Sequence, residues 1–239
     1  MTSRCPVSPK LMKNFFLKRL SAAHVRFQSG LLLNEEPLMS HVCAETYVPG
    51  TFLQLGASVQ MHSHPAILHR KGINGTDKFG CDLAWTVRVY GAGVAGGPLW
   101  RKTAFFQLKR LFYTPKGRRP SVSVEHKQLS DAKRPGFWER AFVVAVDPET
   151  AMTVVSDCAS IVVKKNVSGK TTVDCTTPAW TLLDDWLQAW FECTVGVRES
   201  ETKEARLEAT RERPQDLESP HIRVWVDTRI EMIERGGQG

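Results

Sequence analysis

The sequence predicts an α+β protein: a β-rich single domain on a mainly antiparallel sheet with two or three helices, a basic N-terminal arm and an acidic helical C-terminal tail. Two observations predict this class. β-branched and aromatic runs punctuated by Gly and Pro fill the middle of the chain. Helical periodicity is confined to a few short segments. With 239 residues, 42% hydrophobic, the chain has material for one core, and no apolar run reaches the roughly 18 residues of a membrane-spanning helix.

Charge divides the chain into three segments: a basic amphipathic arm (1–34), a β-rich core domain (35–196) and a charged C-terminal extension (197–239). The net charge of +7 is uneven, because no acidic residue occurs in 1–34 or in 83–124, whereas 13 acidic and eight basic residues follow Ala179. This asymmetry is typical of a surface that faces a polyanion, although a solvated basic face gives the same pattern.

Five segments are predicted to be strands: Thr51–Met61, Asp82–Tyr90, Ser121–His126, Phe137–Val146 and Ala151–Val163. The tetrapeptide 147–150, with Pro148 in the second turn position, predicts a hairpin between 143–146 and 152–155. A second hairpin is expected over Ile161–Asp174, with its turn at 166–169.

Two amphipathic helices are predicted. Leu99–Tyr113 carries basic and apolar sets at helical spacing. Thr177-Pro178 is typical of a helix start, and the helix would run to Glu192 and pack on the sheet. Residues 199–213 are charged on all sides, which indicates a solvated or mobile helix. The alternating segment 222–226 indicates an edge strand.

Candidate chemistry is sparse. The glycines of 91–96 follow a predicted strand and precede a predicted helix, as in a dinucleotide-binding turn, but no acidic residue follows at the required spacing, and a flexible loop is the favoured interpretation. Histidines cluster at His62, His64 and His69, and the His-x-His of 62–64 on a strand would place two rings on one face, where they suit a metal. His41, Cys43 or Cys81 would be the third ligand, although surface histidines are favoured. We expect no metal or cofactor. The six cysteines form no CxxC pair, which favours a reducing compartment.

The N-terminal segment admits two interpretations. It lacks acids and has Arg26 before Phe27, as in a mitochondrial presequence removed near that point. In the second interpretation, the segment is retained as a basic arm that lies on anionic lipid or nucleic acid.

Polyanion binding is the interaction that the charge layout favours. Basic side chains would contact phosphates while the aromatic neighbours Phe105, Phe106, Phe112 and Tyr113 stack on bases. The candidate binding residues for nucleic acid or lipid are Lys10, Lys13, Lys18, Arg19, Arg26, Arg101, Lys102, Lys109, Arg110, Lys116, Arg118 and Arg119. No nucleophile elbow or carboxylate pair indicates catalysis.

A basic arm, a β-rich body and a basic segment without catalytic groups are together similar to viral matrix proteins. Residues 160–169, Ser-Ile-Val-Val-Lys-Lys-Asn-Val-Ser-Gly, resemble a late strand and turn of rhabdovirus matrix proteins of the plant type. This resemblance implies a structural, non-enzymatic protein that bridges ribonucleoprotein and membrane. It would be located in the virion and in the host nucleus or at the membrane periphery. No budding motif is present, and the acidic extension has no counterpart.

The expected function is therefore that of a self-associating, matrix-like assembly protein. Its partners would be ribonucleoprotein or RNA, an anionic membrane surface and further copies of the chain, with the Trp186 and Trp190 helix face as the contact between copies. Two alternatives remain open: a mitochondrially targeted enzyme or assembly factor with a cleaved presequence, located in the mitochondrial matrix, and an RNA-binding viral movement protein.

Overall fold

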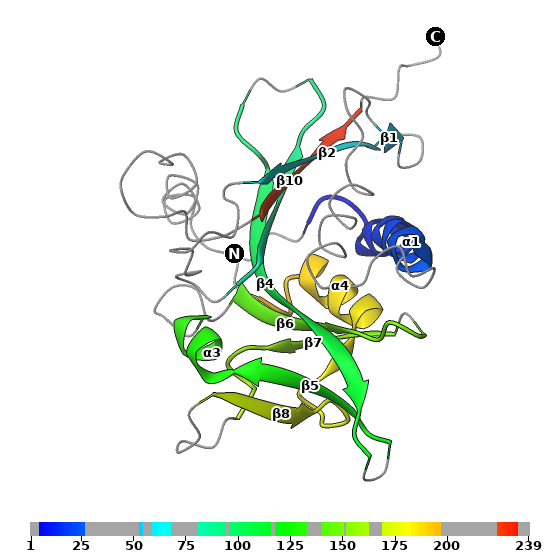
Figure 1. Cartoon of the computed structure of the whole chain (residues 1–239). Coiled ribbons are helices and arrows are strands. Elements are labelled where there is room, and N and C mark those ends of the chain that lie inside the picture. The colour runs from blue at the N-terminus through cyan, green and yellow to red at the C-terminus, as the bar shows by residue number, and fades with distance from the viewer. Residues whose placement is uncertain are drawn as a thin grey trace.

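A ten-stranded mixed sheet with three helices forms the described part of the protein (Figure 1). The computed structural model describes residues 5–26, 53–54, 59–67, 81–93, 96–115, 118–132, 140–150, 152–162, 169–196 and 224–233. The predicted class, a β-rich α+β protein, is confirmed at this level. Among the described strands, only the β3–β10 and β4–β6 pairings are parallel.

The elements follow one another with these bounds. The first half contains α1 (Pro9–Arg26), β1 (Leu53–Gln54), β2 (Val59–Ile67), β3 (Leu83–Tyr90), β4 (Trp100–Tyr113), β5 (Pro120–Glu125) and α3 (His126–Ala132). The second half contains β6 (Ala141–Val146), β7 (Thr153–Asp157), β8 (Lys170–Asp174), β9 (Thr181–Leu182), α4 (Leu183–Phe191) and β10 (Val224–Met232). The strand order is β1-β2-β10-β3-β4-β6-β7-β9, and β5 branches from β4 to pair with β8.

Strand β4 occupies the segment for which we predicted a basic amphipathic helix, so that prediction is wrong. The strand is buried on both faces: Trp100 and Phe106 lie in the apolar cluster beside α4, while Phe105 and Leu111 lie in the cluster beneath β5. When both faces of a strand are buried, apolar residues recur along the sequence at odd as well as even spacings. Spacings of three and four are then present, and these are also the spacings of an amphipathic helix.

Strand β10 lies in the interior of the sheet, between β2 and β3. Val226 and Ile230 are buried in the main cluster, and the indole Nε1 of Trp85 donates to Thr228 Oγ1 at 3.0 Å. The predicted strand is therefore present from Val224 onward, but its expected position at an edge of the sheet is wrong. One strand of the sheet, β10, therefore comes from the segment 197–239, which the charge pattern indicated to be a separate extension.

Helices α1 and α4 cover one face of the sheet, side by side (Figure 1). Met12 and Phe16 of α1 are buried, and the Phe16 ring packs edge-on against Trp85 with centroids 4.7 Å apart. Since α1 and β10 both contribute to this core, it combines residues from all three segments recognised in the sequence.

Helix α4 begins at Leu183 with Leu182 as its N-cap, five residues after the predicted N-cap Thr177. The difference arises because Thr181 and Leu182 pair with Val155 and Val154 of β7, which holds them extended. The predicted packing on the sheet is confirmed, since Trp186, Leu187, Trp190 and Phe191 are all buried.

Of the two predicted hairpins, the first is confirmed, and the turn and first strand of the second lie largely outside the described residues. Strands β6 and β7 pair with Val146 opposite Thr153, around the predicted turn at 147–150. Strand β8 pairs with β5, with Val122 opposite Val173. Residues 163–168 and 199–213 lie outside the described residues. None of the described helices has the length and hydropathy to cross a membrane.

Candidate polyanion-binding surface

The predicted binding residues of α1 have different environments. Lys10 and Lys18 are exposed. Lys13 is largely covered, and its Nζ lies 3.5 Å from Asp184 Oδ2 and 3.9 Å from Asp185 Oδ1 of α4. Lys13 therefore joins two helices of its own chain. Arg19 and Arg26 also lie in α1, and their side chains are outside the described set.

Lys102 is fully buried, so it is not part of a binding surface. Its Nζ donates to the carbonyl oxygens of Trp190, at 2.7 Å, and Val195, at 2.6 Å. Burial lowers the pKa of this lysine to about 8, against the raising effect of the nearby Cys193. The interpretation of Lys102 as a phosphate contact is wrong, because its side chain stands on the same face of β4 as Trp100 and Ala104.

Basic residues become accessible toward the end of β4. Arg101 is half-buried, and Lys109 Nζ donates to Gln128 Oε1 at 3.1 Å. Arg110 is exposed, as are Arg118 and Arg119 after the turn, and Lys116 lies outside the described residues. Of the aromatic neighbours, Phe105 and Phe106 are buried, whereas Phe112 and Tyr113 retain 37% and 44% of their exposure.

Arg110 and Phe112 lie on one face of β4, and together with the turn before β5 and the outward residues of β5 and β8 they form what we call the hairpin surface. Leu111, Val122 and Val173 point into the core or pack against it, so the residues on either side of each point outward. The hairpin surface consists of Arg110, Phe112, Arg118, Arg119, Ser123, Glu125, Lys170, Thr172 and Asp174. Ser121 lies in the same row as Phe112 and Asp174, but it is buried. The surface extends over the end of β4, the turn before β5 and the outward-facing residues of β5 and β8.

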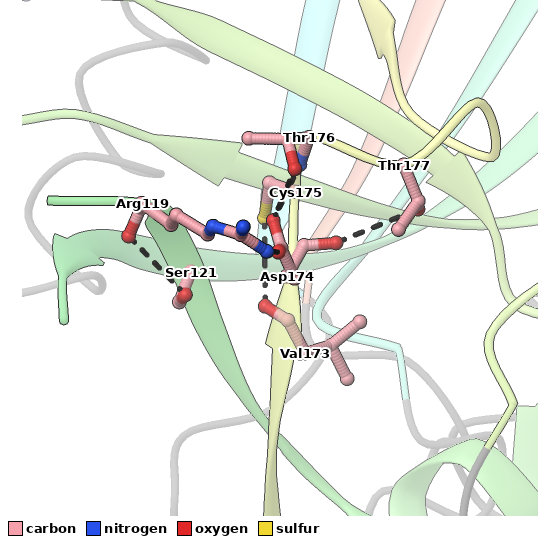
Figure 2. Close-up of polar contacts among 7 residues, drawn as sticks. All are labelled: Arg119, Ser121, Val173, Asp174, Cys175, Thr176 and Thr177. Carbon is pink, nitrogen blue, oxygen red and sulfur yellow. Dashed lines mark hydrogen bonds and ion pairs between the residues drawn. The ribbon is translucent and has the colours of Figure 1, made fainter. Parts of the chain in front are cut away.

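Asp174 organises one end of the hairpin surface (Figure 2). Its Oδ1 accepts the backbone N–H and the hydroxyl of Thr176, at 2.8 and 2.7 Å, and its Oδ2 accepts Arg119 Nη1 at 3.2 Å. The hydrogen bonds from Thr176 first, and then the contact with Arg119, lower the pKa of this carboxyl. The side-chain hydroxyl of Ser121 donates to the Arg119 carbonyl at 3.3 Å, which fixes the backbone beneath the guanidinium.

The turn before β5 holds Arg118 in a left-handed backbone conformation, with φ of 51°. Two backbone hydrogen bonds close the loop: Arg118 N donates to Thr114 O, and Thr114 N donates to Arg119 O, each at 3.2 Å. The loop thereby presents Arg118 and Arg119 at adjacent exposed positions.

Positive charge exceeds negative charge on this surface. Arg119 pairs with Asp174, and Lys170 Nζ lies 3.4 Å from Glu125 Oε1. Arg110 and Arg118 have no acidic partner among the residues that the structure describes. Exposed pairs such as these contribute about 0–1 kcal/mol, so a phosphate group can replace the carboxylate at Arg119 at little cost.

The glycine segment 91–96 does not form a dinucleotide site. It connects β3 to β4, which are antiparallel with Val89 opposite Trp100, and no helix follows. A pyrophosphate site of that type needs a helix N-terminus directly after the glycines. Gly93 has φ of 62°, as the reversal requires.

Most residues of the predicted metal site have no described side chain. His62 and His64 both belong to β2, where their side chains are not described, and His69 is outside the described residues. The residues that are described contain no group of three or more metal-ligating side chains. The cysteines among them are free thiols, and the set does not include Cys43.

The fold and the surface define a class: a β-rich α+β protein with an accessible, arginine-bearing sheet face. Comparison with protein-family models, with curated proteins and with solved structures finds no match.

Proposed function

We propose that this protein is a non-enzymatic, polyanion-binding assembly protein whose hairpin surface binds phosphate groups. The carrying observation is that Arg110, Arg118 and Arg119 are all exposed on the β4–β5 hairpin and its turn, with one surface ion pair, between Arg119 and Asp174. Arginine suits this role because its planar guanidinium binds phosphate oxygens in pairs.

A matrix-like bridging role extends the proposal to ribonucleoprotein and membrane. The exposed Lys10 and Lys18 of α1 offer a second basic site, and α1 lies beside α4, away from the β5–β8 pair (Figure 1). Two separate basic sites allow one molecule to contact two phosphate-bearing partners. The local resemblance of 160–169 to rhabdovirus matrix proteins supports the same role.

The packing of α1 favours a retained N-terminal segment over a cleaved presequence. Phe16 contacts Trp85 and also stacks on Phe191, with centroids 6.0 Å apart. Removal of the first 27 residues would expose these aromatic rings, at about 25 cal/mol for each Å² of apolar surface returned to water.

Self-association cannot use the α4 face that we expected to mediate it. Trp186 retains 3% of its exposure and Trp190 none, because both rings lie against the sheet. Contacts between copies, where they form, must use other surfaces.

The test is direct binding of a short RNA and of vesicles that contain anionic lipid, each over a series of salt concentrations. Arg118→Ala/Arg119→Ala should weaken binding of at least one probe about ten-fold or more at low salt. Against RNA, the slope of log affinity on log salt should fall in magnitude by about 1 to 2.

The matched control is Lys127→Ala, which removes one exposed cation from α3, and it is compared with Arg118→Ala alone. The control should leave the slope unchanged. Binding of both probes that is indifferent to Arg118→Ala/Arg119→Ala would overturn the proposal.

A further inference from the structure

We infer that the polyanion of the hairpin surface is a single-stranded nucleic acid, with one base stacked on Phe112 and its phosphates on the neighbouring arginines. This inference rests on the proposed function and names the ligand of the same surface. It does not depend on the second basic site on α1.

The position of Phe112 in the sheet makes its ring available. Phe112 lies directly opposite Ser121 of β5, and Ser121 lies opposite Asp174 of β8. Ser121 is itself buried beneath its neighbours and is too small to cover an aromatic ring across a strand pair, and Phe112 keeps 37% of its exposure. An aromatic ring on a sheet face beside small neighbours is a stacking platform for an unpaired base.

Cations flank this ring along the strand and across it. Arg110 is two residues before Phe112, so it stands on the same face. Arg119 lies across the strand pair from Phe112, and its Nη1 donates to Asp174 Oδ2 at 3.2 Å. A nucleic-acid strand that stacks one base on Phe112 therefore passes between the guanidinium groups of Arg110 and Arg119. This arrangement suits the phosphates on either side of the stacked base.

Hydroxyl groups continue the surface beyond the ring. Ser123 and Thr172 lie opposite each other in the next outward row. Thr172 is exposed and Ser123 is half-buried. Hydroxyls both donate and accept, so they suit the edges of any base without fixing its identity. The surface is thus expected to bind with little sequence preference.

The carboxylates of this surface argue against a membrane as its partner. Asp174 is held ionised by its hydrogen bonds, with a lowered pKa, and it lies in the same row as Phe112. Insertion of Phe112 into lipid would bring this charge into the interface and remove its water. A single strand lies along the surface and leaves Asp174 hydrated.

The experiment measures fluorescence anisotropy of a labelled 12-nucleotide single-stranded RNA, a duplex of the same length and vesicles with anionic lipid, all at low salt. Phe112→Leu should weaken single-strand binding by about 5- to 100-fold, the range for loss of one stacked base, with the salt slope unchanged. Phe112→Trp should bind at least as tightly as the wild type. Leu99→Ala, at a more exposed apolar position in the β3–β4 turn, should have no effect.

The outcomes separate this inference from the proposed function. Arginine variants that weaken binding while Phe112→Leu binds like the wild type would overturn the stacking site and leave phosphate binding intact. Duplex bound as tightly as single strand, or vesicles bound in place of RNA, would also overturn the inference. Thermal unfolding of each variant ensures that a loss of binding is not a loss of the fold.

Discussion

The ammonium of Lys102 lies 2.7 Å from the carbonyl oxygen of Trp190, so a lysine near the start of β4 caps the end of α4. Trp190 belongs to the last turn of α4, where carbonyl groups lack partners within the helix and the helix dipole is negative. The Trp190 ring also lies below the cation, with its centroid 5.0 Å from Nζ. The helix end therefore compensates a buried charge through its carbonyls and an aromatic ring.

The first prediction concerns the pH dependence that Lys102 imposes. Because burial lowers the pKa of this lysine from 10.5 to about 8, the folded state releases its proton before the unfolded state does. The contribution of Lys102 to the free energy of unfolding therefore rises between about pH 8 and 10.5, by about 2 kcal/mol at pH 10 relative to pH 7. Lys102→Met should abolish this rise.

Urea unfolding at pH 7, 9 and 10 checks it, with the exposed Lys127→Met as control. The difference in stability between wild type and Lys102→Met should grow with pH by more than the difference for the exposed Lys127→Met. Parallel profiles for all three proteins would contradict a lowered pKa at Lys102.

A second prediction concerns the turn between β6 and β7. Asp147 Oδ1 accepts the N–H of Glu149, and its Oδ2 accepts the hydroxyls of Thr150 and Tyr113, the latter at 2.9 Å. Burial alone would raise the pKa of Asp147, but these hydrogen bonds outweigh it and lower the pKa. Stability from this carboxylate is present above its ordinary pKa and is lost as pH falls through the lowered value.

Tyr113→Phe should cost about 0.5–1 kcal/mol at pH 7, and Asp147→Asn should cost more because it affects three donors. In a double-mutant cycle the two changes should couple by about 0.5 kcal/mol or more. Asp147→Asn should also weaken the acid-side loss of stability. Additive effects would show that the Tyr113 hydroxyl contributes nothing to the turn.

A third prediction follows from the interior position of β10. Ile230 is fully buried, so Ile230→Ala should lower the free energy of unfolding by about 2–5 kcal/mol. Its neighbour Arg229 faces outward and is exposed, and Arg229→Ala should cost about 1 kcal/mol or less. Equal, small effects at the two positions, measured by chemical denaturation, would be inconsistent with an interior strand.

A fourth prediction tests whether α1 belongs to the folded core. Phe16→Ala should cost about 3–5 kcal/mol and Met12→Ala about 2–5 kcal/mol, because both side chains are buried. Lys10→Ala, on the exposed side of the helix, should change stability by less than about 0.5 kcal/mol. Near-ultraviolet circular dichroism should lose Trp85 signal in Phe16→Ala. A protein that tolerates all three changes equally would restore the cleaved presequence as an interpretation.

The features that the sequence predicted correctly depend on residues that are close together along the chain. The turn at 147–150 is set by Pro148 and by the side chain of Asp147, both within the turn. The buried face of α4 follows from spacing within the helix. The position of β10 depends on pairing with β2 and β3, which are far away in the sequence, and no local pattern contains that information.

The candidate site was predicted in part. Arg110, Arg118 and Arg119 are exposed as a basic run suggests, but the same run includes the buried Lys102. A signal was available there, since Trp100 and Ala104 precede and follow Lys102 at strand spacing and mark its face as apolar. For Lys13 no such signal exists, because its acidic partners lie in a helix that only the fold brings near.

The placement of β10 between β2 and β3 also determines when the sheet can close. Trp85 and Thr228 are in contact although 143 residues separate them along the chain. Until residues 224–232 have left the ribosome, β2 and β3 have no strand to join them, and two unpaired edges remain open. Folding must then wait for a long-range closure, which is slow and exposes those edges to other chains. A newly made molecule is thus most prone to pair with a neighbour just before its own last strand arrives.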